Sequence, residues 1–265
     1  MKLSGIHVYP VKSFAGFSQT EAFVTRRGLL MDRQWMLVDE DGDFLSQREC
    51  PEMALVKTSV VDKQLHLTFD VETYSIPLSP APDQERLWVT VWGDEVEAQL
   101  VNEGADNWLS DILGTNCRLV YMPEVSRRLV DRQYANSKDD LVRFSDGFPV
   151  LLTNESSLEW LNGHLLQPVT MNRFRPNLVV SGFEPFEEDR WKEVRIGEVT
   201  FAVVKPCARC SITTIEPTTA KRGKEPLKTL AQFRTFDGKV LFGQNLIPLH
   251  EGTLRLDSTV NVCYK

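Results

Sequence analysis

The sequence predicts a mainly β protein with a few helices. Short segments of alternating apolar and polar residues recur along most of the chain, and turn residues separate them. Two such segments flank Asp41-Gly42, and two more flank Gly93-Asp94, which is typical of β-hairpins. Helical periodicity is confined to three short stretches. We therefore expect β-barrel-like architecture in which the helices are minor additions.

The first half of the chain consists almost entirely of predicted strands. They lie in the segments GIHVYPV, WMLVDEDGDFLSQ, LHLTFD, YSIPL and RLWVTVWGDEVEAQLV. One helix is predicted over residues 104–113, because its large apolar side chains share one face and Gly114 follows as a stop signal. Residues 120–146 are polar and charged, which favours a long connection between two parts of the chain. We place the boundary near Pro123, which divides the chain into domains 1–122 and 123–265.

The second half begins with a predicted helix after Asn154, a good N-cap residue, and this helix ends near Gly163. Another helix is predicted where Leu227, Leu230 and Phe233 recur at helical spacing. The remaining segments alternate as strands do. They are LVVSG, EVRIGEVTFAVVKP, CSITTIEP and GTLRLDSTVNVCY.

Charge and composition exclude several classes of protein. The formal net charge is −7 at pH 7, so the surface lacks the cationic footprint that nucleic acids and anionic membranes require. No apolar run approaches the roughly twenty residues that span a bilayer, and the first residues do not resemble a signal peptide. Five scattered cysteines do not fit a secreted disulfide scaffold. We expect a soluble, cytoplasmic protein with reduced thiols and no nucleic-acid or membrane partner.

The sharpest local signal is Cys207-Ala208-Arg209-Cys210, a Cys-x-Arg-Cys turn between two strand-like segments. A structural zinc site is disfavoured because the sequence has no second pair of metal ligands at suitable spacing. A thioredoxin-like pair is disfavoured because the β-branched residues after Cys210 predict a strand rather than a helix. Two readings stay open: inert, buried cysteines, or a thiolate favoured by Arg209 that binds a soft metal whose other sulfur ligands come from a cofactor.

Cationic residues form three further clusters. Lys12 and Ser13 end a predicted strand, Asp32-Arg33 and Gln47-Arg48 follow, and MNRFRPN supplies Arg173, Arg175 and Asn177. Taken singly, such residues are usually solvated surface. If the clusters met in space, they would form a pocket for a phosphate or another anion. We predict that Lys12, Arg33 and Arg175 face one pocket near Cys210.

An ordered set of segments resembles the successive signatures of the MOSC family, and within it the YcbX-type and mitochondrial amidoxime-reducing-component branch. The resemblance extends from Ile6 to about Val262. Its segments are YPVKS, GLLMDRQW, SQREC, FSDGFPVLLTNESSL, MNRFRPNLVVSG, EEDRW, VKPCARCSITTIEP, GKEPLKTLAQFR and LFGQNL. An ordered set of this kind is far more specific than the Cys-x-Arg-Cys turn alone.

The resemblance implies a MOSC N-terminal β-barrel domain followed by the MOSC domain, and a molybdenum cofactor whose dithiolene supplies two sulfur ligands. Cys210, the second cysteine of the motif, matches the family's thiolate ligand to the metal. Other matched positions imply contacts to the pterin and its phosphate. These residues are Lys12, Ser13, Arg33, Asp146, Gly147, Arg175, Ala208, Arg209 and Asn245.

The implied activity is reduction of N-hydroxylated compounds, which include hydroxylamines, amidoximes and N-hydroxylated bases, with a role in detoxification. The sequence lacks the Cys-x4-Cys-x2-Cys pattern of a plant-type ferredoxin, so we expect no iron–sulfur cluster in this chain. Electrons would come from a separate flavin reductase, or a ferredoxin-like or cytochrome b5-like protein. The acidic residues Glu187, Glu188 and Asp189 are weak candidates for proton relay, because such runs are usually solvated.

Two other functions remain. Cys210 could carry a persulfide delivered by a pyridoxal-phosphate-dependent desulfurase, a role that matches the superfamily's association with pyridoxal phosphate. Such a sulfur carrier needs an exposed thiolate but no deep pterin pocket, so Lys12, Arg33 and Arg175 favour the reductase. A β-barrel binding protein with inert cysteines is the third possibility. Bound molybdenum, cyanide-releasable sulfur, or neither would separate the three.

Overall fold

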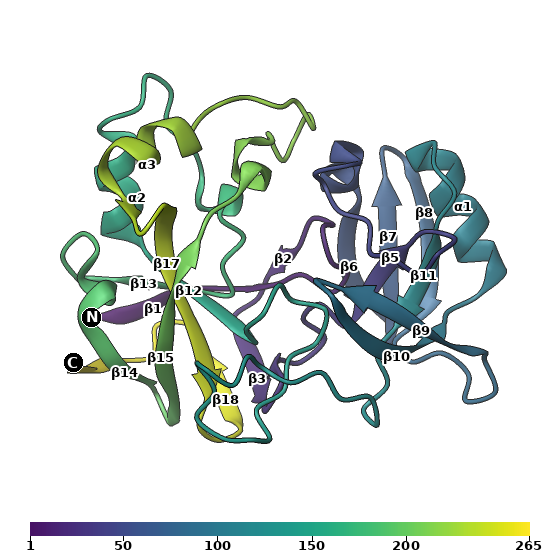
Figure 1. Cartoon of the computed structure of the whole chain (residues 1–265), viewed down its shortest axis with the longest axis horizontal. Coiled ribbons are helices and arrows are strands. Elements are labelled where there is room, and N and C mark those ends of the chain that lie inside the picture. The colour runs from purple at the N-terminus through teal and green to yellow at the C-terminus, as the bar shows by residue number, and fades with distance from the viewer.

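The computed structural model describes residues 1–265 and confirms the mainly β class. Two lobes lie side by side, and both termini belong to the same lobe (Figure 1). We call this lobe, formed by residues 1–30 and 147–265, the large lobe. Residues 34–122 form the small lobe, and residues 123–146 run between the two.

The large lobe contains a nine-stranded sheet and a three-stranded sheet. Eight strands of the first follow the order β19-β14-β15-β17-β12-β13-β1-β2, and β16 pairs with β17. Their bounds are β1 Lys2–Val8, β2 Phe17–Ser18, β12 Val150–Asn154, β13 Leu178–Ser181, β14 Trp191–Ile196, β15 Val199–Ala208, β16 Thr235–Phe236, β17 Lys239–Pro248 and β19 Val260–Tyr264. The smaller sheet has the order β18-β3-β4, with β3 Glu21–Thr25, β4 Gly28–Leu29 and β18 Gly252–Arg255. A core of 20 buried apolar residues draws side chains from both sheets.

The first strand of the chain belongs to the large lobe. β1 pairs antiparallel with β13, so that Lys2 lies opposite Ser181 and Ile6 opposite Leu178. β3 likewise pairs with β18 near the end of the chain. The domain limits 1–122 and 123–265 stay a prediction. Strand pairing nevertheless shows that the large lobe draws residues from both sides of Pro123.

The small lobe packs two antiparallel sheets and one helix around two apolar clusters of 17 and 9 buried residues, to which Val11, Phe14 and Phe144 also contribute. The sheet orders are β5-β11-β10-β9 and β6-β7-β8. The strands are β5 Trp35–Val38, β6 Lys57–Val61, β7 Gln64–Phe69, β8 Glu72–Pro77, β9 Arg86–Val91, β10 Asp94–Leu100 and β11 Arg118–Tyr121. Both predicted turns are present, since Gly42 (φ +86°) and Gly93 (φ +85°) adopt the left-handed backbone that favours glycine.

All three predicted helices are confirmed. Helix α1 (Glu103–Leu113) begins where the Asn102 side chain accepts a hydrogen bond from the Ala105 amide, and it ends at left-handed Gly114. Helix α2 (Glu155–Asn162) has Asn154 as its N-cap, and helix α3 spans Leu227–Phe233. Four short 3-10 helices span Pro51–Leu55, Met171–Arg173, Glu187–Arg190 and Ser211–Thr214. None of the helices has the length and apolar character needed to cross a membrane.

The strand predicted in CSITTIEP is wrong. Ser211–Thr214 form a 3-10 turn, although Ile212, Thr213 and Thr214 are β-branched. The threonine hydroxyls explain the difference, because Thr213 Oγ1 donates to Cys210 O at 2.9 Å and Thr214 Oγ1 donates to Ser211 O at 2.7 Å. These local bonds offset the β preference of the side chains. The turn brings Cys210 to the edge of a cavity between the lobes.

Candidate functional site

A cavity between the two lobes brings the predicted site residues together. We call it the Cys210 cavity. Residues from the segment after β1, the segment after Phe144, β15, β17 and the small lobe all face it. Every residue predicted from the sequence to contact a cofactor lines this one space: Lys12, Ser13, Arg33, Asp146, Gly147, Arg175, Ala208, Arg209, Cys210 and Asn245. The predicted convergence of the cationic clusters is therefore a feature of the fold.

The cysteine motif leaves the end of β15 and turns into the Ser211–Thr214 helix. Cys210 is exposed, and Cys207 is half-buried. Arg209 Nη1 donates to Cys207 Sγ at 3.0 Å and Nη2 donates to Phe174 O at 2.7 Å. The expectation that Arg209 favours the thiolate form of Cys210 is thus corrected, because this guanidinium is hydrogen-bonded to Cys207 instead. Within the motif, Cys210 is the sulfur free to meet a ligand.

The cation beside Cys210 comes from the other lobe. Arg48 Nη1 lies 4.0 Å from Cys210 Sγ, and its guanidinium carbon lies 4.6 Å from the centre of the Trp92 ring. Arg48 belongs to one of the cationic clusters in the sequence, where no role at the site was predicted for it. Residues 48 and 210 are far apart in the chain, so only the docking of the two lobes brings them together. The one feature of the sequence that could have indicated a role for Arg48 was its place in SQREC, a segment that carries the family resemblance.

Lys12 and Asp146 form an ion pair at the wall of the cavity. Lys12 Nζ donates to Asp146 Oδ1 at 2.6 Å and to Phe144 O at 2.9 Å. Burial lowers the pKa of the Lys12 ammonium, although Asp146 opposes that effect. For Asp146, burial raises the pKa, but Lys12 and a hydrogen bond from Trp92 hold it well below its usual range. Asp146 is therefore ionised at neutral pH and faces the Lys12 side chain.

The segment that carries Asp146 and Gly147 is fixed by hydrogen bonds from a buried arginine, Arg128. Arg128 donates through Nη1 to Arg143 O at 2.9 Å and also to Ser145 O, while its Nε donates to Asp94 at 2.8 Å. Only 3% of the Arg128 side chain is exposed. Charge-assisted bonds to several carbonyls fix an irregular segment that has no strand or helix of its own. The result is a defined position for Asp146 at the cavity.

Arg33 and Arg175 lie on one aromatic ring. Their guanidinium carbons are 4.2 and 4.4 Å from the centre of the Tyr9 ring. Arg33 Nη1 also donates to both carboxylate oxygens of Asp32 at 2.8 Å, and Arg33 Nη2 donates to Arg175 O at 3.1 Å. Asp32 is 1% exposed, so its charge is compensated within the protein by Arg33.

Arg175 is the cavity cation that lacks a protein partner. No carboxylate or carbonyl accepts a hydrogen bond from its guanidinium, and burial together with the charge of Arg33 lowers its pKa to about 10. It remains charged at neutral pH. A half-buried guanidinium with free donors beside another cation is suited to an anionic ligand.

Three of the residues with a left-handed backbone line the same cavity. Ser13 (φ +71°), Arg33 (φ +46°) and Arg175 (φ +54°) all adopt the left-handed conformation that disfavours residues with side chains. Three such residues line one cavity, where their backbone turns direct side chains inward. At Gly147 a Cβ atom would meet nothing within 4 Å, which leaves open space beside Asp146. The residues present thus fit a bulky anionic group.

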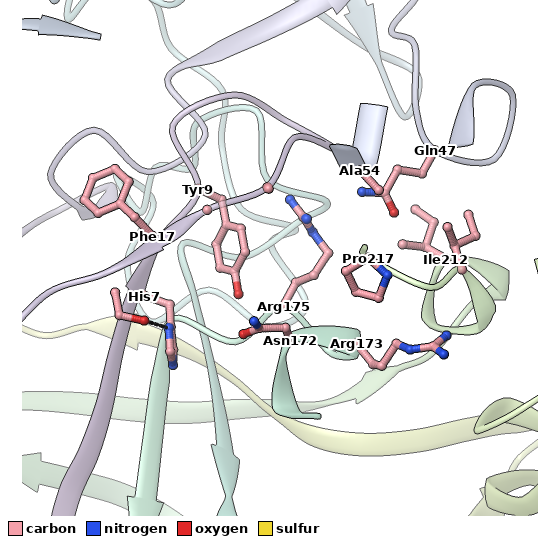
Figure 2. A pocket seen from close by; sticks show the side chains of 14 residues that line it. His7, Tyr9, Phe17, Gln47, Ala54, Asn172, Arg173, Arg175, Ile212 and Pro217 are labelled. Carbon is pink, nitrogen blue, oxygen red and sulfur yellow. Dashed lines mark hydrogen bonds between the residues drawn. The ribbon is translucent and has the colours of Figure 1, made fainter. Parts of the chain in front are cut away.

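A second cavity lies against the first and shares Arg175 and Ile212 with it. We call it the Tyr9 cavity. Figure 2 shows the Tyr9 hydroxyl, Asn172 and Arg173 around this space, with the hydrogen bond between His7 and Ser18 on one side. No aspartate or glutamate lines it. Arg173 is bound elsewhere, since its guanidinium pairs with Glu216 at 2.6 Å.

Comparison with known proteins identifies the family. A model of the MOSC N-terminal beta barrel domain matches residues 1–116, and a model of the MOSC domain matches residues 139–261. The chain is 35% identical over 271 residues to mitochondrial amidoxime-reducing component 1 from Mus musculus, and the match covers 96% of this chain and 79% of the relative. This chain belongs to the MOSC family. The resemblance inferred from the sequence is confirmed.

Other MOSC relatives differ in how much of their length this chain covers. Mitochondrial amidoxime-reducing component 1 from Homo sapiens is 32% identical over 270 residues, which cover 96% of this chain and 80% of the relative. Molybdenum cofactor sulfurase from Oryza sativa subsp. japonica is 35% identical over 265 residues, which cover 91% of this chain but 32% of that protein. YiiM from Geobacillus stearothermophilus, a solved structure, is 17% identical to this chain. The match covers 44% of this chain and 54% of YiiM, with a TM-score of 0.34.

The chain's own acidic and metal-ligating side chains have a limited part at the Cys210 cavity. No group of three or more His, Cys, Asp and Glu side chains is arranged to hold a metal ion, so a metal at Cys210 needs ligands from outside the chain. The acidic residues Glu187, Glu188 and Asp189 do not line the cavity. Glu187 and Glu188 are buried rather than solvated, because they belong to a polar cluster within the large lobe.

Proposed function

We propose that this MOSC protein is a molybdenum-cofactor-dependent oxidoreductase that reduces N-hydroxylated compounds with electrons from a separate redox partner. The observation that carries this proposal is the Cys210 cavity, where an exposed thiol and an unpartnered guanidinium face the same space. The relatives named amidoxime-reducing component, which match almost the whole chain, support the substrate class.

The chain's own groups have distinct roles in this proposal. Arg175, Arg33 and Lys12 would bind the phosphate and pterin, because cationic donors are the natural partners of phosphate oxygens. Ser13, Asn245 and the backbone at Ala208 would add hydrogen bonds, and Cys210 would be the thiolate ligand to the metal. When bound, the cofactor would supply a two-electron centre that removes oxygen from nitrogen. Overall, a hydroxylamine takes up two electrons and two protons and gives an amine and water.

The proposal also includes the electron donor. The chain would depend on a flavin reductase, or a ferredoxin-like or cytochrome b5-like protein, and it would not oxidise NADPH by itself. The relatives carry "mitochondrial" in their names. A cytoplasmic location for this chain remains a prediction.

Metal analysis combined with turnover tests the proposed function. Purified protein should contain about one molybdenum per chain and should reduce benzamidoxime to benzamidine with an artificial one-electron donor. NADPH alone should not support turnover. Full metal occupancy without any reduction of amidoximes, hydroxylamines or N-hydroxylated bases would refute the reductase assignment.

A second candidate is a sulfur carrier in which Cys210 holds a persulfide from a pyridoxal-phosphate-dependent desulfurase. The exposure of Cys210 and the similarity to plant molybdenum cofactor sulfurase favour it. The cationic wall of the cavity favours the reductase instead, since a persulfide needs no phosphate site. Cyanide-releasable sulfur on a molybdenum-free protein would identify the carrier.

A further inference from the structure

The Tyr9 ring forms part of the partition between the two cavities. Tyr9 lines the Tyr9 cavity but not the Cys210 cavity, whereas Arg175 lines both and Arg33 lines the Cys210 cavity. Only 4% of Tyr9 is exposed. Its hydroxyl points into the Tyr9 cavity, and its ring lies beside the Arg175 side chain (Figure 2). The ring, rather than the hydroxyl, contacts the cationic wall.

The two arginines on this ring are restrained to different degrees. Arg33 is held by the Asp32 carboxylate, by Arg175 O and by a backbone bond from its own amide to Tyr9 O at 2.8 Å. Asp32 also accepts a hydrogen bond from the Tyr9 amide at 2.9 Å, which ties the backbone on both sides of the ring. The guanidinium of Arg175 has no such bond. It lies against the face of the Tyr9 ring, and the more distant charges of Asp32 and Asp146 also attract it.

The Tyr9 ring offsets the electrostatic repulsion between the two arginines. Arg33 and Arg175 repel each other, which contributes to the low pKa of Arg175. The face of an aromatic ring carries negative charge density, so one ring attracts both guanidinium groups. A saturated side chain of similar volume fills the space but supplies no such attraction.

We propose that Tyr9 is a positioning residue whose ring holds the Arg175 guanidinium in place for the anionic end of the ligand in the Cys210 cavity. This inference rests on the proposed function only in that the ligand is a phosphate-bearing cofactor. The phenol oxygen has no part in it, because no protein group bonds to that hydroxyl and burial raises its pKa, which keeps it neutral.

The test compares Tyr9→Leu with Tyr9→Phe, because phenylalanine keeps the ring and leucine removes it. Inorganic phosphate is titrated into cofactor-free, full-length protein and binding is followed by calorimetry. The expected result is about tenfold weaker phosphate binding for Tyr9→Leu, equivalent to about 1.4 kcal/mol. Tyr9→Phe should stay within twofold of the wild type. Molybdenum content of protein made with cofactor should fall in the same order.

Each outcome has a defined meaning. Equal phosphate affinity in Tyr9→Leu and wild type, with both folded at the assay temperature, would overturn the inference. Equal losses in Tyr9→Leu and Tyr9→Phe would overturn it as well, since the hydroxyl would then be the active group. If Tyr9→Leu does not fold, Tyr9→Met serves in its place. Wild-type protein that binds neither phosphate nor molybdenum would instead refute the proposed anion site, which is a distinguishable result.

Discussion

The two faces of strand β17 show how a binding site differs from a buried polar cluster. Asn245 faces the Cys210 cavity, while its neighbour Gln244 is fully buried and donates to Asp189 Oδ1 at 2.6 Å. Successive residues of a strand point to opposite sides, so one strand serves both regions. Charged groups gather on each side.

The difference between the two regions lies in how their charges are compensated. In the polar cluster, Asp189 pairs with Arg234, and Glu188 accepts hydrogen bonds from Ser157 and Asn154. In the Cys210 cavity, by contrast, Arg175 is charged and no carboxylate or carbonyl accepts a hydrogen bond from it. Buried charge in itself therefore does not mark a site. A site is marked by a charge that no protein group balances and that faces open space.

The largest expected effect separates the two cysteines of the cavity. Cys210→Ser replaces a soft thiolate with a hard hydroxyl, so we expect turnover to fall to background while the fold survives. Cys207→Ser is the matched control, and it should retain metal and much of the activity. Metal analysis and reductase assays of both variants provide the measurement. Equal loss of activity with full molybdenum content in both would mean that the cysteines act as a redox pair.

Arg175→Met should produce the next largest effect, because it removes the unbalanced charge and keeps an unbranched apolar side chain. We expect cofactor occupancy to fall at least tenfold, since charge-assisted bonds to phosphate contribute about 1.5–3 kcal/mol each. Arg234→Met provides a comparison from the polar cluster, where the arginine has an internal partner. That variant should lose stability and keep its occupancy once folded. Unchanged molybdenum content in Arg175→Met would contradict the claim that an unbalanced charge distinguishes the Cys210 cavity from the polar cluster.

Arg48→Met should have a smaller effect on a different quantity. Its Nη1 atom lies 4.0 Å from Cys210 Sγ, and Arg48 comes from the small lobe. We expect molybdenum content close to that of the wild type and turnover reduced several-fold, because a positive charge beside the sulfur is lost. The ratio of turnover to bound metal is the quantity to measure. A proportional loss of both would place Arg48 among the residues that hold the cofactor.

Glu188→Gln should leave activity unchanged and alter the pH dependence of stability. Burial raises the pKa of Glu188 to about 7, so its folded form favours the proton. The protonated carboxyl contributes its full stability at pH values below the pKa it has in the unfolded chain. This contribution is lost as the pH rises through the folded pKa of about 7, and the total loss is about 3 kcal/mol. Denaturant unfolding at pH 5 and pH 8 measures this change. Glu188→Gln should lack it, and equal pH dependence in the two proteins would contradict the assignment.

Much of the site was predictable because its residues occur in short, recognisable segments. Lys12 and Ser13 follow a strand, Arg175 precedes another, and Cys210 belongs to a turn, so each local position followed from the sequence. The three helices were predictable for the same reason, since their caps and periodicity are local. The resemblance to the MOSC family supplied the expectation that these segments meet.

Individual side-chain contacts could not be predicted. The approach of Arg48 to Cys210 depends on how two lobes dock, and the pairing of Arg209 with Cys207 depends on side-chain geometry within a turn. The 3-10 turn after Cys210 was missed because propensity favoured a strand, while two threonine hydroxyls favoured the turn. Burial of Glu188 was likewise invisible, because nothing local in an acidic run reveals that α2 covers it.

The pairing of β1 with β13 has a consequence for synthesis on the ribosome. Lys2 and Ser181 are neighbours in the sheet, yet roughly 10–35 s of translation separate them at about 5–20 residues per second. The small lobe emerges complete during that interval and can fold, whereas β1 must wait for its partner. Lys12 can bond to Phe144 O and to Asp146 only once those residues have emerged. Arg175, Cys210 and Asn245 all follow the small lobe in the chain, so a nascent chain completes the Cys210 cavity late and a ligand can bind there only after that.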